Sequence, residues 1–161
     1  MTTAIIIPTF SNCQVLIRCL ESIFDLTRDA EYRIIIIDNG STDDTPIYLE
    51  DVRKRHSNLT VIRNETNVGF VKATNLGLKQ LNPDEHACLC NDDIIITDPM
   101  WLSRMLGDLQ GDIGAVGCVS NYAGWLQNFA NSTSIPKTKH TSHLLIYFCG
   151  IIRADALAKV G

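Results

Sequence analysis

Long hydrophobic runs are missing from this chain of 161 residues. The uninterrupted apolar stretches extend over only a few residues, well short of the roughly 20 that a transmembrane helix requires. The first eight residues have neither the basic flank nor the apolar core of a secretory signal. We therefore expect a cytoplasmic protein with no transmembrane segment, and a peripheral contact with a membrane stays open.

Basic residues are also sparse. The chain has 14 Lys and Arg against 18 Asp and Glu, for a net charge of -4, and its basic residues are scattered rather than clustered. Without a basic face, nucleic acid is not an expected partner. If the ligand is an anion, a bound cation must therefore mediate part of the contact.

Several familiar motifs are absent. No strand is followed by GxGxxG and no P-loop occurs, which argues against a dinucleotide-binding enzyme. A receiver-like signalling domain would need an acidic pair after the first strand, where Pro8-Thr9-Phe10 stands instead. The six cysteines form no CxxC pair, so we expect reduced, mostly buried thiols rather than a zinc site.

Apolar runs rich in isoleucine alternate with segments of helical spacing. The pattern predicts strands over residues 3–7, 32–37, 59–62, 87–90, 113–119 and 144–152. Helices are predicted after Ser11 or Asn12, after Ser41 or Thr42, and over 70–81, 99–109 and 153–160. Four consecutive isoleucines at 34–37 suit a parallel strand that is buried on both faces. The fold class is therefore α/β, a mostly parallel sheet flanked by helices in three layers.

The regular pattern ends after Ser120. Residues 120–143 mix small polar residues with Tyr122, Trp125 and Phe129, which fits either a partly ordered lid or an ordinary connection. We expect one domain over 1–161, with a nucleotide-binding half over about 1–119 and the start of an acceptor half over about 120–161. A helix that has barely begun at Gly161 suggests that this domain is incomplete at its C-terminus.

Acidic residues follow two of the predicted strands. Asp92 and Asp93 come after the strand at 87–90, and Asp38 ends the strand at 32–37. Because the carboxyl ends of parallel strands lie at one edge of a sheet, we expect these carboxylates to converge where ligands bind. Clustered carboxylates repel unless a cation neutralises them, and Mg²⁺ is commonly held by one or two carboxylates and substrate phosphates. The alternatives are a solvated acidic turn at 92–93 and a turn-forming role for Asp38.

Five segments together resemble the nucleotide-sugar-binding part of the family 2 glycosyltransferases, which have the Rossmann-like GT-A fold. They are IIIPTF at 5–10, IDNGSTDDT at 37–45, NVGF at 67–70 followed by Ala73, Asn75 and Gly77, NDD at 91–93, and DP at 98–99 followed by Trp101 and Leu102. The segments have the order and spacing of the family over about 150 residues. The sequence CGIIR at 149–153 also resembles the family's strand before the acceptor side.

The resemblance implies a role for each matching residue. The nucleotide would be bound by Pro8, Thr9, Phe10, Asp38, Asn67, Gly69, Lys72, Asn91 and Asp92. In that arrangement Pro8 and Phe10 line the base pocket, and Asp38 accepts a hydrogen bond from a uracil-type imide N–H. Residues 91–93 correspond to the DXD motif, where Asp92 faces the ribose or the sugar and Asp93 binds Mg²⁺ or Mn²⁺ on the diphosphate.

The function implied by the resemblance is inverting transfer of a sugar from a UDP- or dTDP-type donor to a hydroxyl of a carbohydrate or lipid-linked acceptor. No residue of this chain matches the family's general base, which is expected beyond Gly161, so the catalytic residue is unknown. The alternative is a catalytically incomplete nucleotide-binding module, or a fragment of a larger transferase.

Overall fold

A computed structural model describes residues 1–118 and 148–160. Its strands are β1 (Thr3–Thr9), β2 (Tyr32–Asp38), β3 (Leu59–Arg63), β4 (His86–Cys90), β5 (Ala115–Gly117) and β6 (Cys149–Ile152). Its helices are α1 (Cys13–Leu26), α2 (Thr45–Arg55), α3 (Phe70–Leu78), α4 (Trp101–Asp108) and α5 (Ala154–Val160). The alternation of strands and helices that the sequence predicts is confirmed.

The strands form one mixed sheet in the order β3-β2-β1-β4-β6-β5. The first four strands of this order are parallel, whereas β6 runs antiparallel to both β4 and β5. All seven residues of β1 are buried, as are residues 34–38 of β2, because helices cover both faces of the sheet. The predicted mostly parallel sheet is confirmed, with an antiparallel strand inserted near one edge.

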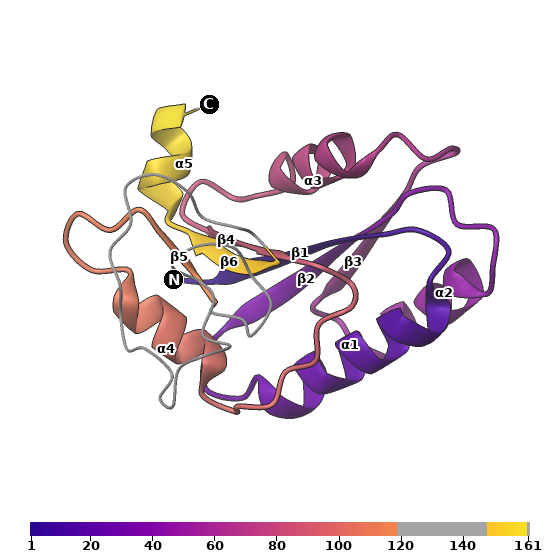
Figure 1. The fold of residues 1–161 in the computed structure, drawn as a ribbon, viewed down its shortest axis with the longest axis horizontal. Coiled ribbons are helices and arrows are strands. Elements are labelled where there is room, and N and C mark those ends of the chain that lie inside the picture. The colour runs from indigo at the N-terminus through magenta and orange to yellow at the C-terminus, as the bar shows by residue number, and fades with distance from the viewer. Residues whose placement is uncertain (119–147, 161) are drawn as a thin grey trace, which may run out of the picture.

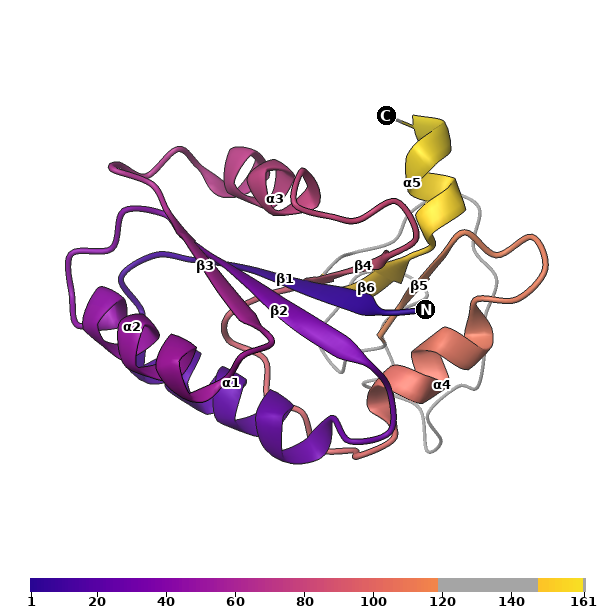
Figure 2. The same cartoon turned by 180° about the vertical axis from the view of Figure 1, so that it is seen from behind.

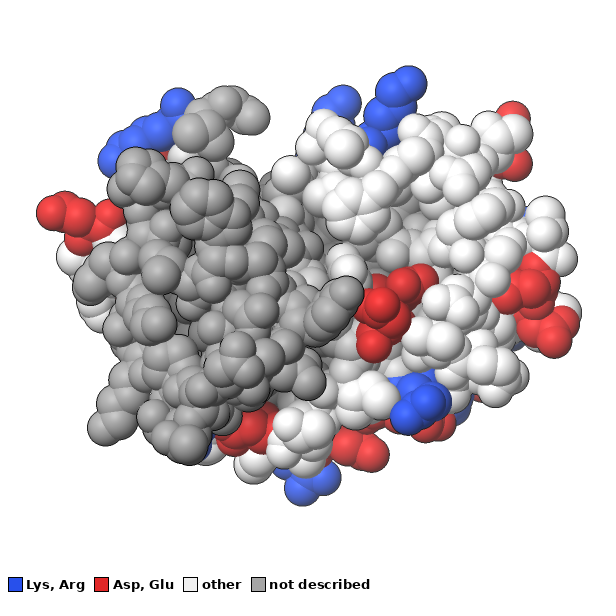
Figure 3. Space-filling model, viewed as in Figure 1, with Lys and Arg blue, Asp and Glu red and all other residues white. Residues whose placement is uncertain are grey.

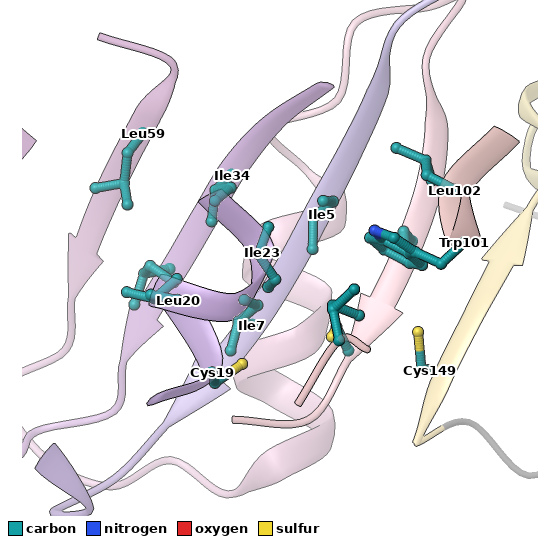
Figure 4. Close-up of a cluster of buried hydrophobic side chains, with 14 of the residues drawn as sticks. Ile5, Ile7, Cys19, Leu20, Ile23, Ile34, Leu59, Trp101, Leu102 and Cys149 are labelled. Carbon is teal, nitrogen blue, oxygen red and sulfur yellow. The ribbon is translucent and has the colours of Figure 1, made fainter. Parts of the chain in front are cut away.

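Helices lie on both faces of the sheet (Figures 1 and 2) and complete the three layers. Helices α1, α2 and α4 pack on one face, where Leu20, Ile23 and Leu102 contact the side chains of alternate strand residues (Figure 4). Helix α3 packs on the other face through Ala73, together with Leu157 of α5. This packing holds the carboxyl ends of β1, β2 and β4 in fixed positions relative to one another.

Helix α1 begins after Asn12, as predicted, but α2 begins later than predicted, at Thr45. Neither Asn12 nor Asp44, the residues that precede these helices, caps its helix with its side chain. Instead, side chains of the loop after β2 bond the backbone at the start of α1 and just before it. Asp43 Oδ2 accepts the N–H of Cys13 at 3.0 Å, and Ser41 Oγ accepts the N–H of Ser11 at 2.9 Å. The predicted start of the second helix at Ser41 or Thr42 is therefore wrong: α2 begins at Thr45, and Ser41 and Thr42 instead bond Ser11, just before α1.

Helix α4 begins later than predicted. Asp98 Oδ1 accepts the N–H of Met100 at 2.9 Å, so Asp98 closes a turn, and the helix begins only at Trp101. Pro99 is therefore outside the helix rather than at its first position. Of the strand predicted at 113–119, the structure has β5 over Ala115–Gly117, and position 119 lies outside the described residues.

Helix α3 ends at Leu78, three residues before the predicted end. Its buried residues are Ala73, Thr74 and Gly77, whereas Val71 is exposed. A Cβ on Gly77 would overlap Cγ2 of Ile6 in β1. A glycine within this helix therefore permits the close approach of α3 to the sheet.

The predicted lid at 120–143 and the first part of the strand predicted at 144–152 lie outside the described residues. Within the described part of the chain, no helix is long and apolar enough to cross a membrane. None of the six cysteines forms a disulfide, and five of them are buried, as the sequence predicts.

Candidate functional site

A pocket of about 370 Å³ opens at the carboxyl edge of the sheet, beside the ends of β1, β2 and β4. It brings together seven of the residues predicted from the sequence: Pro8, Thr9, Phe10, Asn67, Asn91, Asp92 and Asp93. Four further lining residues were not predicted as site residues: Ser11, Asn12, Asn39 and Phe70. The convergence of strand ends that the pattern predicts thus forms a real cavity.

Asp38 does not line this pocket. Its side chain is 1% exposed, and Oδ1 accepts the N–H of Ser41 at 2.8 Å. Oδ2 lies 3.1 Å from Nη1 of Arg63, an ion pair without hydrogen-bond geometry. Asp38 and Arg63 line a separate, smaller cavity of about 230 Å³. The Asp38 carboxylate is thus bonded to Ser41 and paired with Arg63, outside the larger pocket.

Gly69 and Lys72 also lie apart from the lining residues. Gly69 precedes α3 with a φ of +85°, a conformation that glycine adopts without strain, and its N–H donates to Asn67 Oδ1 at 2.9 Å. Gly69 therefore shapes the loop that carries Asn67. Lys72 is exposed on α3 and does not line the pocket.

The acidic end of the pocket is formed by the turn after β4. Asp92 Oδ2 accepts a hydrogen bond from Thr9 Oγ1 at 2.7 Å, which ties this turn to the end of β1. Burial raises the pKa of the Asp92 carboxyl, the hydrogen bond from Thr9 opposes this shift, and the neighbouring charge of Asp93 adds to it. None of the described residues that line the pocket is Lys, Arg or His. The described lining of the pocket therefore provides no cation for these two carboxylates.

This donor set fits a divalent cation that is shared with a ligand. Among residues 1–118 and 148–160, no three His, Cys, Asp or Glu side chains are grouped so as to hold a metal by themselves. Asp92 and Asp93 supply hard oxygen donors, and Mg²⁺ or Mn²⁺ sites of this kind are commonly completed by phosphate oxygens and water. Figure 3 shows acidic side chains gathered near the middle of the drawn face.

Two aromatic rings form the apolar part of the lining. Phe10 is 46% exposed and Phe70 is 56% exposed, although large apolar side chains are usually buried. Phe10 follows β1 and Phe70 begins α3, so the rings reach the pocket from separate elements. Aromatic faces of this kind stack on flat ring systems. Phe70 could have been suspected from its place outside the apolar spacing of its helix.

A network of asparagine side chains forms another wall. Asn39 Oδ1 accepts the N–H of Val68 at 3.0 Å and a hydrogen bond from Asn64 Nδ2 at 3.0 Å. Asn39 Nδ2 donates to Asn67 Oδ1 at 2.8 Å. This network fixes the loop between β3 and α3 against the end of β2. The involvement of Asn39, one residue after Asp38, was missed by the sequence-based prediction of site residues.

Comparison with known proteins extends these observations. The family model described as "Glycosyl transferase family 2" matches residues 4–161. A protein of Haemophilus influenzae, named an uncharacterized glycosyltransferase, is 29% identical over 107 residues, which cover 66% of this chain and 32% of that protein.

Solved structures share the fold. The mannosyltransferase PcManGT from Pyrobaculum calidifontis, in complex with GDP-Man and Mn²⁺, superposes with a TM-score of 0.77 at 18% identity. That match covers 99% of this chain and 46% of the mannosyltransferase. TarS 1–349 of S. aureus, in complex with UDP-GlcNAc, gives a TM-score of 0.72 at 20% identity, and the match covers 99% of this chain and 47% of TarS 1–349.

The chain thus spans less than half of each of these three proteins. At these identities the two solved structures show the fold, a GT-A glycosyltransferase fold in which this mixed sheet is recognisable. The match of the family model extends over nearly the whole chain. The protein therefore belongs to glycosyl transferase family 2 and is a glycosyltransferase domain.

Proposed function

We propose that the pocket binds the nucleoside diphosphate part of a nucleotide-sugar donor together with Mg²⁺ or Mn²⁺. The observation that carries this proposal is the composition of the pocket. Two exposed phenylalanine rings and an asparagine wall lie in the same cavity as two adjacent carboxylates with no basic side chain among its described lining residues. Such a site suits a flat base at one end and a metal-bound diphosphate at the other.

Each part of the pocket has a role in this proposal. Phe10 and Phe70 stack on the base, while Asp93 holds the metal and Asp92, positioned by Thr9, faces the ribose or the sugar. The metal, when bound, stabilises the negative charge that develops on the leaving diphosphate. The Thr9–Asp92 hydrogen bond keeps the acidic turn close to β1, so that its carboxylates do not rotate away into solvent.

The finer parts of the function belong to the same proposal. We propose inverting transfer to a hydroxyl of a carbohydrate or lipid-linked acceptor, with the nucleotide-binding half formed by about residues 1–119. The UDP- or dTDP-type donor that the resemblance implies belongs to this proposal too, while Asp38, the acceptor expected for an imide N–H, does not line the pocket. The cytoplasmic location stays a prediction, and so does the general base beyond Gly161.

Titration calorimetry of the purified chain with UDP, CDP and GDP, with and without Mn²⁺, tests donor binding. We expect binding that requires Mn²⁺, and the Asp93→Asn variant should weaken it about tenfold or more. The control is Asp84→Asn, which removes a charge from an exposed position just before β4, at the opposite end of this strand.

Two results would contradict the proposal. One is the absence of binding for all three nucleotides with Mn²⁺ present, and the other is equal weakening by the two variants. Assays for the transfer of radiolabelled sugar to added acceptors then separate an active transferase from the alternative, a nucleotide-binding module without turnover.

A further inference from the structure

The connection between β4 and α4 carries the two carboxylates of the pocket and runs beside α1 (Figure 1). Side chains of α1 and of Thr27, the residue that follows it, hold this connection through three hydrogen bonds. Cys19 Sγ donates to the carbonyl of Asn91 at 3.7 Å, Ser22 Oγ accepts the N–H of Ile96 at 2.9 Å, and Thr27 Oγ1 accepts the indole N–H of Trp101 at 2.9 Å. The connection is therefore bound along the length of one helix.

Ser22 has the most defined role among these contacts. A backbone N–H can only donate, so the hydroxyl of Ser22 must be the acceptor toward Ile96. The hydrogen of the same hydroxyl is donated to the carbonyl of Cys19, one turn earlier in α1, at 2.8 Å. Because its donor and an acceptor position are both engaged, the hydroxyl is fixed between its own helix and the connection.

This contact lies on the far side of the acidic turn from Thr9. Thr9 bonds Asp92 at the end of β1, and Asp93 is the next residue. Among residues 1–118 and 148–160, the next hydrogen bond from a helix or strand to the connection after Asp92 is the one at Ile96. Asp93, the residue assigned to the metal, therefore lies between an anchor on β1 and an anchor on α1.

We propose that Ser22 is a positioning residue for metal binding, which acts by holding the connection so that the carboxylate of Asp93 stays in the pocket. The inference rests on the proposed function, because it concerns the metal end of the same donor site. Metal ligands bind tightly when neighbouring hydrogen bonds hold them in place. Without the hydroxyl, the N–H of Ile96 loses its acceptor, and the connection rearranges toward water to satisfy it.

The chain offers a conservative variant and a matched control. Ser22→Ala removes the hydroxyl, whereas Ser22→Thr keeps it, since a threonine in a helix can direct its hydroxyl to the carbonyl of the preceding turn. The control is Ser103→Ala in α4. Ser103 Oγ donates to the carbonyl of Met100 at 3.1 Å, the same bond to the preceding turn, but it does not bond the acidic turn or Ile96.

The experiment is titration calorimetry of the full chain in the presence of Mn²⁺, with the nucleotide among UDP, CDP and GDP that the unchanged protein binds most tightly. We expect Ser22→Ala to weaken binding about two- to tenfold, the range that one hydrogen bond supplies. Ser22→Thr should restore most of the affinity, and Ser103→Ala should leave it unchanged. An unchanged affinity in Ser22→Ala overturns the inference, as does an equal loss in Ser22→Ala and either of the other two variants.

A second titration separates positioning of the metal ligand from a general effect on the pocket. Ser22→Ala is measured again in the Asp93→Asn background, where we expect its effect to disappear, because the carboxylate that it positions is gone. The same fold-loss in both backgrounds would show a merely structural role and overturn the inference, while the proposed function stands. If the unchanged protein binds none of the three nucleotides with Mn²⁺, the proposed function fails, and the inference fails with it.

Discussion

Two carboxylates at opposite ends of β4 have opposite surroundings. Glu85, just before the strand, accepts two hydrogen bonds from Arg33, at 2.7 Å each, and one from the N–H of Asn82 at 2.8 Å. Asp92, two residues after the strand, accepts a hydrogen bond from Thr9, and Asp93 is next to it in the chain. Hydrogen bonds from Arg33 lower the pKa of Glu85, whereas burial raises the pKa of Asp92.

This difference in surroundings indicates that the carboxylate at the amino end of β4 stabilises the fold, whereas those at the carboxyl end are available to a ligand. At the amino end, the protein neutralises the carboxylate itself, so the charge of Glu85 stabilises the fold. At the carboxyl end, the described lining residues provide no cation, so the charge of Asp92 disfavours the folded state until a ligand compensates it. Two carboxylates that no basic residue of the described lining compensates are suited to binding a metal with a diphosphate.

Removal of Arg33 should give the largest effect on stability. Its guanidinium also donates to the carbonyl of Gln80 at 2.6 Å, so Arg33→Met leaves a buried carboxylate and a carbonyl without their partner. We expect a loss of about 2–4 kcal/mol in the free energy of unfolding, measured by urea denaturation.

The matched control for Arg33→Met is Arg53→Met, which breaks an exposed ion pair with Glu50 on α2. This variant should leave the free energy of unfolding nearly unchanged, because solvent screens an exposed pair. Equal losses in the two variants would show that the pair at the amino end of β4 is no more than a surface contact.

The sequence predicts the sheet because its signal is repeated along the chain. Ile34, Ile35, Ile36 and Ile37 are all buried, and such a run is typical of a parallel strand that is buried on both faces. The starts of the helices are less predictable because they depend on contacts across the fold. Asp43, expected within its own helix, accepts the N–H of Cys13 at the start of another.

The candidate site could be predicted in position but not in every side chain. Neighbouring residues of a strand point to opposite sides, so the choice between Asp38 and Asn39 depends on where β2 ends. The strand ends at Asp38, and Asn39 is the residue that lines the pocket. A hydrogen-bonded wall such as that of Asn39, Asn64 and Asn67 has no periodic signal, since it joins two loops separated in sequence.

Exchanging each carboxylate for its amide should separate stability from binding. In Glu85→Gln the bonds with Arg33 lose their ionic character, and we expect the free energy of unfolding to fall by about 1–2 kcal/mol. Nucleotide binding in the presence of Mn²⁺ should be unchanged, since Glu85 lies outside the pocket. In Asp92→Asn the free energy of unfolding should change by less than about 1 kcal/mol, while nucleotide binding weakens. A variant that loses both properties, or neither, would contradict this division.

The smallest expected effect is the dependence of stability on pH, and it has opposite signs at the two ends of β4. Since the pKa of Glu85 is lowered by folding, its contribution is present above the pKa of the unfolded chain, about 4.3, and is lost as the pH falls through the lower folded value. The pKa of Asp92 is raised by folding, so ionisation of Asp92 destabilises the protein. The loss of stability begins as the pH rises above the pKa of the unfolded chain, about 3.9, and is complete above the higher pKa of the folded protein.

Urea denaturation of Glu85→Gln, Asp92→Asn and the unchanged protein between pH 3 and 7 measures both contributions. The stability advantage of the unchanged protein over Glu85→Gln should shrink as the pH falls. For Asp92→Asn, the stability relative to the unchanged protein should instead rise as the pH increases. Parallel curves for the three proteins would mean that neither carboxylate is coupled to folding, and the contrast between the two ends of β4 would then be one of geometry alone.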